Sequence, residues 1–537
     1  EEDLRVVSPR SASPTRSRRP PLPLSPSLHR CHIAVLSVAM DDKELSANDS
    51  RPEAVPNSAS PEQPAEQPIE QTAATYGARL WEVATAFLPM GFVAFGGPQA
   101  HIGLFLKTFV DGKRRWLDEQ RFMELMSLCQ AMPGPTSTQM ATAMGISRAG
   151  VLGGLLAFWL FDWVGFAVQL GVGSAIHALK TTASAESLAT YKMVMLGMGP
   201  AAISQVFTAA HALGTKVCGD DPVKILLALT TAVVALLVEN ALVSAFVFLG
   251  VMLCGGVVTA IDSRRPSRAQ AYEKVLARPT DKGMLKRMGI YKSAGLLLVL
   301  LTFGLFIFTQ FANYFSTNGL GQRQAQYLAI FTTLYKMGIS IYGGGQVVLP
   351  LLEREFVTRT GYESGTVGAS LGSQPMDAET FGFGLALAQS MPGPLFNFSA
   401  FLGAVVASVP GGILGFLGLF GPGIMLIYAF MPFWESARQY QWVRCGLVGM
   451  NAASIGLVFA ACVTLFNKFC LNGAEASVML IAMVLSKRFN VPPPIAIFGC
   501  AALCLALFFL DINGAYGDWC HIEKYGDFST QHATCIP

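Results

Sequence analysis

Two glycine-rich blocks place uncharged hydrogen-bond donors beside backbone that a ligand can approach closely. The first block reads FGGPQAH over 95–101, and the second reads YGGGQ over 342–346. Consecutive glycines weaken a helix and free its backbone N–H groups, which suits an oxyanion. Close packing of helices on glycine is the structural alternative, but the presence of two copies favours an anion cradle. The predicted cradle residues are Gly96, Gly97, Gln99, His101, Gly343, Gly344, Gly345 and Gln346.

Two copies of MPGP, at 132–135 and 391–394, predict broken helices inside apolar segments. Proline lacks a backbone N–H and clashes with the preceding turn, so the helix must end and restart. A restarting helix presents free N–H groups and the positive end of its dipole to an anion. A hinge with capping residues is the alternative interpretation. The candidate substrate ligands around the breaks are Gln130, Pro133, Gly134, Pro135, Thr136, Thr138, Gln389, Pro392, Gly393, Pro394 and Asn397.

Two ionisable residues lie inside apolar segments, where charge is costly and usually functional. Lys336 stands in LAIFTTLYKMGISIY and has no acidic residue one helical turn away. We expect either a bound dianion or a distant acid such as Asp162 to offset its charge. Snorkelling to the membrane interface is the alternative for Lys336. Asp162 is also the candidate proton carrier.

Enzyme and cofactor signatures do not support another kind of chemistry. The sequence has no HExxH motif and no phosphate-binding GxxxxGK[ST] loop. Its 11 cysteines show no Cys/His spacing typical of zinc, and Cys520 and Cys535 are candidates for a disulfide. We therefore predict no enzymatic activity, no metal and no cofactor, and we expect a gradient to drive any transport.

The composition is that of an integral membrane protein. Of the 537 residues, 52% are hydrophobic and 14% are charged, whereas soluble domains carry about 25% charged residues. Repeated apolar runs predict an all-α, polytopic membrane protein with about 10–12 transmembrane helices. The run 223–260 is long for one crossing, and Glu239 and Asn240 predict a helical hairpin within it. The net charge of +3 is spread over loops and indicates topology, not nucleic-acid binding.

The distribution of polar and apolar residues divides the chain into five segments. The N-terminal segment is rich in Ser, Pro and Arg, which predicts disorder, and its first methionine, Met40, is a candidate translation start. The predicted segments are the tail 1–79, the first transmembrane half 80–261, a basic cytoplasmic linker 262–288, the second transmembrane half 289–511 and the tail 512–537.

Four sequence blocks recur in the same order and identify an internal repeat. The matched pairs are 87–99 with 334–346, 128–135 with 387–394, Gly150 and Gly154 with Gly411 and Gly415, and 196–210 with 447–461. This recurrence predicts two homologous halves whose glycine blocks meet near the bilayer midplane.

The loop charges predict that the two halves are inverted. Basic loops stay in the cytoplasm, and the segments 107–121 and 262–292 are rich in Lys and Arg. The segment 353–379, which follows the second glycine block, is mainly acidic. We therefore expect 107–121 and 262–292 on the cytoplasmic side and 353–379 on the other side.

Several of these motifs resemble the chromate transporter family. They include RRWLDEQRF at 114–122, LCQAMPGPTSTQ at 128–139, YGGGQVVLPLLEREFV at 342–357 and ALAQSMPGPLFNFSAFLGA at 386–404. The resemblance covers about 80–511 and implies a two-domain member made of fused homologous halves. It implies chromate efflux by secondary transport, with sulfate as a competitor or co-substrate. Pro89 stands where the family often has a basic residue, which implies an asymmetric site opposite Lys336.

The leading hypothesis is a secondary active transporter that exports chromate across the plasma membrane and gives chromate resistance. The first alternative is a permease for sulfate or another inorganic anion that accepts chromate by mimicry, because both dianions are tetrahedral. The second alternative is a membrane enzyme or a non-transporting sensor. The predicted partners are chromate, sulfate and the lipid bilayer, with no nucleic acid, and a homodimer is left open.

Overall fold

The computed structural model describes residues 75–510 apart from 96, 113, 183–184, 239–240, 277–290, 318–320, 343–344, 346, 358–375 and 471–472. The chain divides into two compact units, Glu1–Gln67 and Pro68–Pro537, and every described residue lies in the second. The described residues form helices and one isolated β-bridge between Val357 and Met376. The predicted all-α fold is confirmed.

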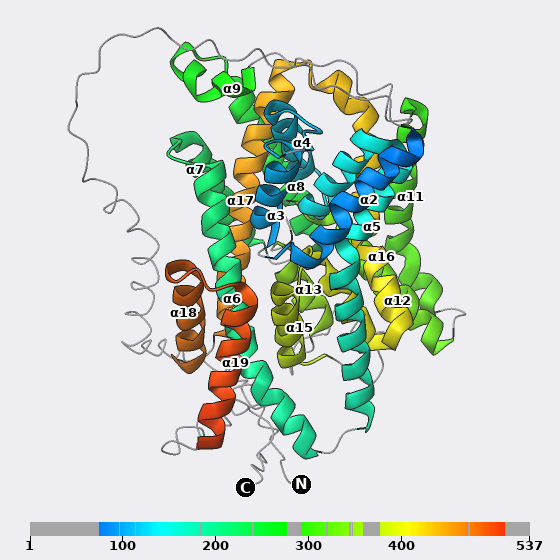
Figure 1. Cartoon of the computed structure of the whole chain (residues 1–537), viewed down its shortest axis with the longest axis vertical. Helices are drawn as coiled ribbons and strands as arrows, with labels where there is room; N and C mark the ends of the chain where they lie inside the picture. The colour runs from blue at the N-terminus through cyan, green and yellow to red at the C-terminus, as the bar shows by residue number, and fades with distance from the viewer. Residues whose placement is uncertain are drawn as a thin grey trace, which may run out of the picture. The chain divides into compact units, whose positions relative to one another are not determined.

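The helices of the first half include the predicted hairpin over 223–260 (Figure 1). Asp221 and Asp262, at the outer ends of the hairpin helices, both bind the side chain of Arg268, at 2.6 and 2.9 Å. The two outer ends therefore lie at one face of the molecule. The helices are α2 (Tyr76–Val93), α3 (Gly97–Phe109), α4 (Glu119–Ala131), α5 (Thr136–Thr182), α6 (Ala185–Val217), α7 (Pro222–Leu237) and α8 (Ala241–Asp262).

The second half repeats this order after a connecting region. The connection holds η1 (Pro266–Tyr272), α9 (Glu273–Leu276) and α11 (Lys292–Thr317). In Figure 1, α3 and α4 lie above α13 and α15, the corresponding helices of the second half. The helices of that half are α12 (Gln322–Ser340), α13 (Val348–Phe356), α15 (Ala378–Ser390), η2 (Leu395–Asn397), α16 (Phe398–Ala437), α17 (Gln441–Phe469), α18 (Gly473–Arg488) and α19 (Pro493–Leu510).

The predicted helix breaks are present at all four motifs. The first MPGP separates α4 from α5, and the second separates α15 from η2 and α16. The first glycine block separates α2 from α3, and the second separates α12 from α13. Each half therefore contains two interrupted helices, as expected where glycine and proline remove the regular hydrogen bonds.

The long helices α5 and α16 each contain a kink of the same geometry. In α5 the backbone leaves the helical region at Ala149 (φ −135°, ψ 22°) and Gly150 (φ 67°, ψ −153°). In α16 it does so at Ala407 (φ −139°, ψ 33°) and Ser408 (φ 54°, ψ −155°). The kinks pair Gly150 with Ser408, so the earlier pairing of Gly150 with Gly411 is wrong by three residues. RAGVLGG at 148–154 corresponds to VASVPGG at 406–412.

The two halves share one interior, in which α5 packs along α16. Phe158 and Phe166 of α5 contact Phe416 of α16, with ring centroids 5.8 and 4.6 Å apart. Within the described part, four helical segments are long and apolar enough to cross a membrane: Thr136–Leu179, Lys292–Phe311, Leu395–Trp434 and Gln441–Asn467. Shorter apolar helices cover Pro222–Leu237, Val247–Asp262 and Pro493–Cys504. The chain is a multi-pass membrane protein.

Candidate functional site

The broken helices of one half are joined to those of the other by two reciprocal backbone hydrogen bonds. The N–H of Gly134, in the first MPGP, donates to the carbonyl of Ile341, beside the second glycine block, at 2.9 Å. The N–H of Gly393, in the second MPGP, donates to the carbonyl of Ala94, beside the first block, at 2.8 Å. Both glycines have positive φ values, 122° and 99°, which other residues rarely adopt. A pseudo-two-fold relation between the halves produces this pattern.

Two amide side chains repeat the reciprocal arrangement. Gln139 donates to the carbonyls of Pro133 (2.7 Å) and Gly423 (3.1 Å), and so links the first break to α16. Asn397, at the equivalent position, donates to the backbone carbonyl of Asp162 (3.3 Å) and links the second break to α5. Both amides follow an MPGP motif as potential oxyanion donors, and Asn397 was among the predicted substrate ligands. Gln139 is four residues after Pro135 and Asn397 is three after Pro394, so the two are equivalent only in the register set by the kinks.

We call the place where the broken helices of the two halves meet the crossing. A polar cluster lies there. Thr138 donates a hydrogen bond to Oδ1 of Asp162 at 3.3 Å, and both residues are fully buried. His101 is also fully buried, its Nε2–H donates to the Ala94 carbonyl at 2.8 Å, and its ring lies edge-on to Phe161. Oδ2 of Asp162 and Nδ1 of His101 have no hydrogen-bond partner among the described residues. Each of these two atoms can therefore accept a hydrogen bond from a ligand or bind a proton.

The second half replaces the polar pair by an aromatic pair. In the register set by the kinks, Phe396 stands at the position of Thr138, and Phe420 stands at the position of Asp162. The rings of Phe396 and Phe420 are in contact, with centroids 5.7 Å apart. The backbone of the crossing is therefore symmetric, whereas its titratable group belongs to the first half.

Lys336 is half-buried on α12, and Pro89 occupies the matching position in α2. The acidic group that acts on Lys336 electrostatically is Glu355 of α13. Sequence analysis considered a dianion or Asp162 as the offsetting charge and omitted Glu355, because it placed that residue in a loop. Helix α12 ends at Ser340 and α13 begins at Val348, so the two charges stand on separate helices on either side of the second glycine block.

The other predicted ligands differ in burial and in what surrounds them. Gln130 is buried and lines a cavity of about 530 Å³, and Nε2 of the half-buried Gln389 has no partner among the described residues. Gly97 begins α3 with φ 72°, and Gly345 packs against Leu395. The remaining buried ligands at the breaks are Pro133, Pro135, Thr136, Pro392 and Pro394.

Part of the predicted cradle lies outside the described residues. This applies to Gly96, Gly343, Gly344 and Gln346, and to the side chain of Gln99. The meeting of the two glycine blocks therefore stays a prediction.

The segment GASLG at 368–372, which has the spacing of the GxSxG motif of hydrolases, also falls outside the described residues.

The arrangement is suited to an anion because amides and hydroxyls surround two helix restarts. Thr136 begins α5 directly after the first break, where helix N–H groups and the dipole favour negative charge. The described donors at the crossing are neutral side chains and backbone N–H groups. Such donors can replace part of the hydration shell of an oxyanion without holding it as tightly as a cluster of fixed cations.

Comparisons with known proteins identify the family of the chain and several relatives. The model of the chromate transporter family matches residues 81–259 and 328–505, which together cover more than half of the chain. The chain is 25% identical over 379 residues to a chromate transport protein of Pseudomonas aeruginosa, covering 71% of this chain and 79% of that protein. It is 22% identical over 443 residues to a chromate transport protein of Cupriavidus metallidurans (81% and 95% covered).

A third relative is an uncharacterized transporter of Methanocaldococcus jannaschii, which is 24% identical over 410 residues (76% of this chain and 89% of that protein). No solved structure matches the chain. The two regions that match the family model contain the four helix breaks, and α11 lies between them. Because the family model matches both halves, the chain belongs to the chromate transporter family.

Proposed function

We propose that this chain is a secondary active transporter that moves chromate across the membrane, and that it acts as an exporter in the plasma membrane. The observation that carries the proposal is that each MPGP break is joined by a backbone hydrogen bond to the residue beside the glycine block of the other half, in a chain of this family. Discontinuous helices near the middle of a membrane domain are where transporters bind ions and substrates. Two relatives of this chain are chromate transport proteins, which supports chromate as the substrate.

The proposed coupling group is Asp162. A buried carboxylate without a cation is costly, whereas a protonated carboxyl is neutral and can donate a hydrogen bond. The described hydrogen-bond partners of Asp162 at the crossing are the Thr138 hydroxyl and, at its backbone carbonyl, the Asn397 amide, and the ring of the preceding Phe161 contacts His101. Proton uptake at Asp162 would remove a negative charge next to the anion path, so proton and anion movements would be linked.

Flux measurements on purified protein test the proposal. The full chain is reconstituted in liposomes, and radiolabelled chromate and sulfate are followed in vesicles of known orientation with and without a pH gradient. Chromate flux that depends on the protein and responds to the gradient is expected. Flux of sulfate with chromate only as a weak competitor would favour a sulfate permease, and no flux of either dianion would overturn the proposed function.

A further inference from the structure

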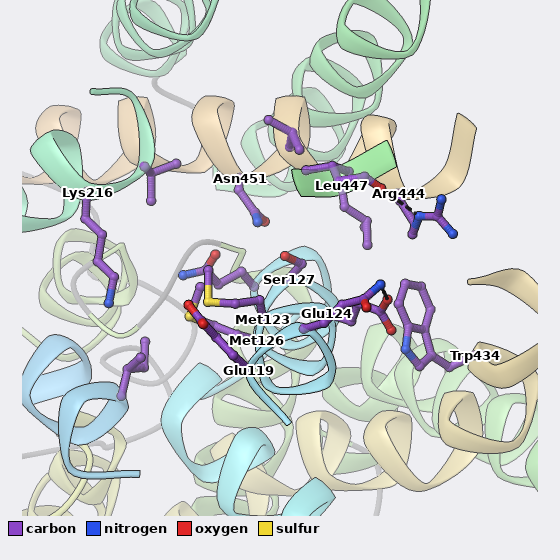
Figure 2. Close-up of a pocket in the computed structure, with 16 residues that line it drawn as sticks. Glu119, Met123, Glu124, Met126, Ser127, Lys216, Trp434, Arg444, Leu447 and Asn451 are labelled. Carbon is purple, nitrogen blue, oxygen red and sulfur yellow. Dashed lines mark hydrogen bonds between the residues drawn. The ribbon is translucent and has the colours of Figure 1, made fainter. Parts of the chain in front are cut away.

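The cavity of about 530 Å³ lies between α4 and α17, outside the crossing described above. Figure 2 shows Met123 and Ser127 of α4 opposite Leu447 and Asn451 of α17, with Lys216 near one end and Trp434 near the other. The volume exceeds that of a hydrated inorganic dianion and falls in the range of small-molecule sites, about 300–1,000 Å³.

Two amide groups form the polar part of its wall. Gln130 and Asn451 are each 7% exposed, and the side-chain oxygen of each has no hydrogen-bond partner in the part of the chain that the structure describes. Gln130 stands two residues before the MPGP break at 132–135. Buried polar groups normally find partners, so these amide oxygens indicate that water or another hydrogen-bond donor enters the cavity close to the break.

The cavity wall holds two cations and two carboxylates, and Arg438, which pairs with Glu124, adds one more positive charge beside it. Glu124 forms an ion pair with Arg438 at 2.7 Å, and Arg444 also acts on it electrostatically. Lys216 adds a further cation to the wall, and its carboxylates are Glu119 and Glu124. Arg444 donates to the carbonyl of Val275, a residue of the basic linker 262–288 that lines the cavity. The cavity therefore opens on the side of that linker.

The equivalent place in the second half is closed. The MPGP register pairs Met123 with Gly382, and the pairing of Gly197 and Met198 with Gly449 and Met450 pairs Asn451 with Gly199. Met123 is 41% exposed, whereas Gly382 is buried against α6. A Cβ atom built on Gly382 would lie 3.6 Å from Cα of Gly199 and 3.2 Å from the ring of Phe469. Helices α6 and α15 thus touch where α4 and α17 stand apart.

We propose that the α4–α17 cavity is the vestibule through which a tetrahedral dianion reaches the first break from the linker side, and that the Gly199–Gly382–Phe469 contact is the closed access on the opposite side. The inference rests on the proposed transport function. In a transporter built from related halves, exchange of the two arrangements opens one side and closes the other. The opposite state would separate α6 from α15 and bring α4 against α17.

Accessibility of a matched pair of cysteines tests this assignment. Ser127→Cys places a thiol in the cavity, and Ala386→Cys places one at the equivalent, fully buried position of the closed side. In liposomes, an anionic, membrane-impermeant methanethiosulfonate should modify Ser127→Cys, with loss of its chromate flux, and chromate should slow the modification. Ala386→Cys and the parent protein, which carries the native cysteines, should keep their flux. Met123→Cys gives a second position in the cavity.

Equal modification rates at Ser127→Cys and Ala386→Cys would overturn the open and closed assignment, whether or not the parent transports. Full modification of Ser127→Cys with unchanged flux would overturn the vestibule. Absence of flux in the parent would instead refute the proposed function.

As a further measurement, oxidation of the pair Gly199→Cys and Gly382→Cys should hold the closed side shut and abolish flux, which a reductant restores. Flux at the parental rate in the oxidised pair would contradict the gate.

Discussion

At the scale of single residues, Lys336 makes the sharpest case for substrate binding. A charged side chain at the centre of a membrane helix costs roughly 2.5–3.5 kcal/mol on translocon scales, and Glu355 offsets part of that cost. We predict that Lys336→Gln lowers chromate flux by about 10-fold or more, because an interaction with a charged group is lost. Lys336→Arg should retain part of the flux, since it keeps the charge with altered geometry. Flux per inserted protein is the measurement.

The double variant Lys336→Gln with Glu355→Gln separates a binding role from a structural ion pair. If Lys336 contacts the dianion, the double variant stays as inactive as Lys336→Gln. Recovery of flux after removal of both charges would show that Lys336 serves only to balance Glu355.

Asp162 is expected to control coupling rather than binding. Asp162→Asn keeps the shape and the hydrogen bond from Thr138 but cannot exchange a proton. We predict that chromate exchange persists in this variant while its dependence on a pH gradient disappears. Thr138→Val, which removes only the hydroxyl donor, should keep the gradient dependence. An Asp162→Asn protein that still concentrates chromate in response to a pH gradient would exclude the residue as the proton carrier.

At the scale of elements, the kink of α5 depends on close approach of two backbone segments. A Cβ atom on Gly145 would lie 2.4 Å from the carbonyl oxygen of Gly153, which allows no side chain. We predict that Gly145→Ala destabilises the protein by about 1–3 kcal/mol, as overpacking does. Gly250→Ala is the matched control, because that helical glycine has no atom within 4 Å of an added Cβ. Thermal unfolding in detergent distinguishes them, and equal midpoints would contradict the proposed contact.

The turn before α7 is tied to the linker by a cluster with a defined pH dependence. Burial alone raises the pKa of Asp221, but hydrogen bonds from Arg268 and the Val223 N–H outweigh it and hold the pKa below its ordinary value. A carboxylate with a lowered folded-state pKa stabilises the protein above its unfolded value of about 3.9, and this stability is lost as the pH falls through the folded value.

We therefore predict that Asp221→Asn lowers the unfolding temperature at neutral pH, and that the difference from the parent shrinks as the pH falls below about 3.9. The neighbouring exposed Asp220 provides the control variant, Asp220→Asn, which should change stability less. A difference between Asp221→Asn and the parent that grows towards acid pH would refute the assignment.

At the scale of the whole molecule, two basic segments meet on one side. Glu119, near the end of 107–121, and Val275, within the linker, line the same cavity. We predict that cysteines placed in 107–121 and 262–292 are labelled from the cytoplasm and that cysteines in 353–379 are labelled from outside. Labelling of all three segments from one side would refute the inverted arrangement.

The breaks and the hairpin could be predicted from sequence because proline and glycine act locally. MPGP removes N–H groups that no distant contact can restore, so α4 and α15 end at the motif. The kinks were harder to align, because Ser408 has a positive φ of 54°, a backbone conformation that sequence analysis expects only at glycine. The small-residue pairs at 150–154 and 411–415 therefore suggested a pairing shifted by three residues.

The parts of the site that sequence missed depend on contacts between distant segments. Glu355 acts on Lys336 from a separate helix, and Gln139 binds a backbone carbonyl of α16 in the other half. The helix α11 lies between the two regions of the family match, although the proposed second half, 289–511, includes it. An extra crossing of this kind between halves would invert the second half relative to the first.

The bonds between Gly134 and Ile341 and between Gly393 and Ala94 join the halves through backbone atoms alone. Substitution of a side chain does not delete a backbone donor or acceptor, except where proline replaces the donor. Apart from the two donor glycines, whose positive φ values disfavour other residues, these bonds do not depend on particular side chains, so each copy could accumulate its own side chains while the halves stayed joined. Such tolerance accounts for a carboxyl beside a hydroxyl in one copy and two aromatic rings in edge-to-face contact in the other. After duplication, the two halves could therefore diverge in their side chains while the backbone hydrogen bonds between them were kept.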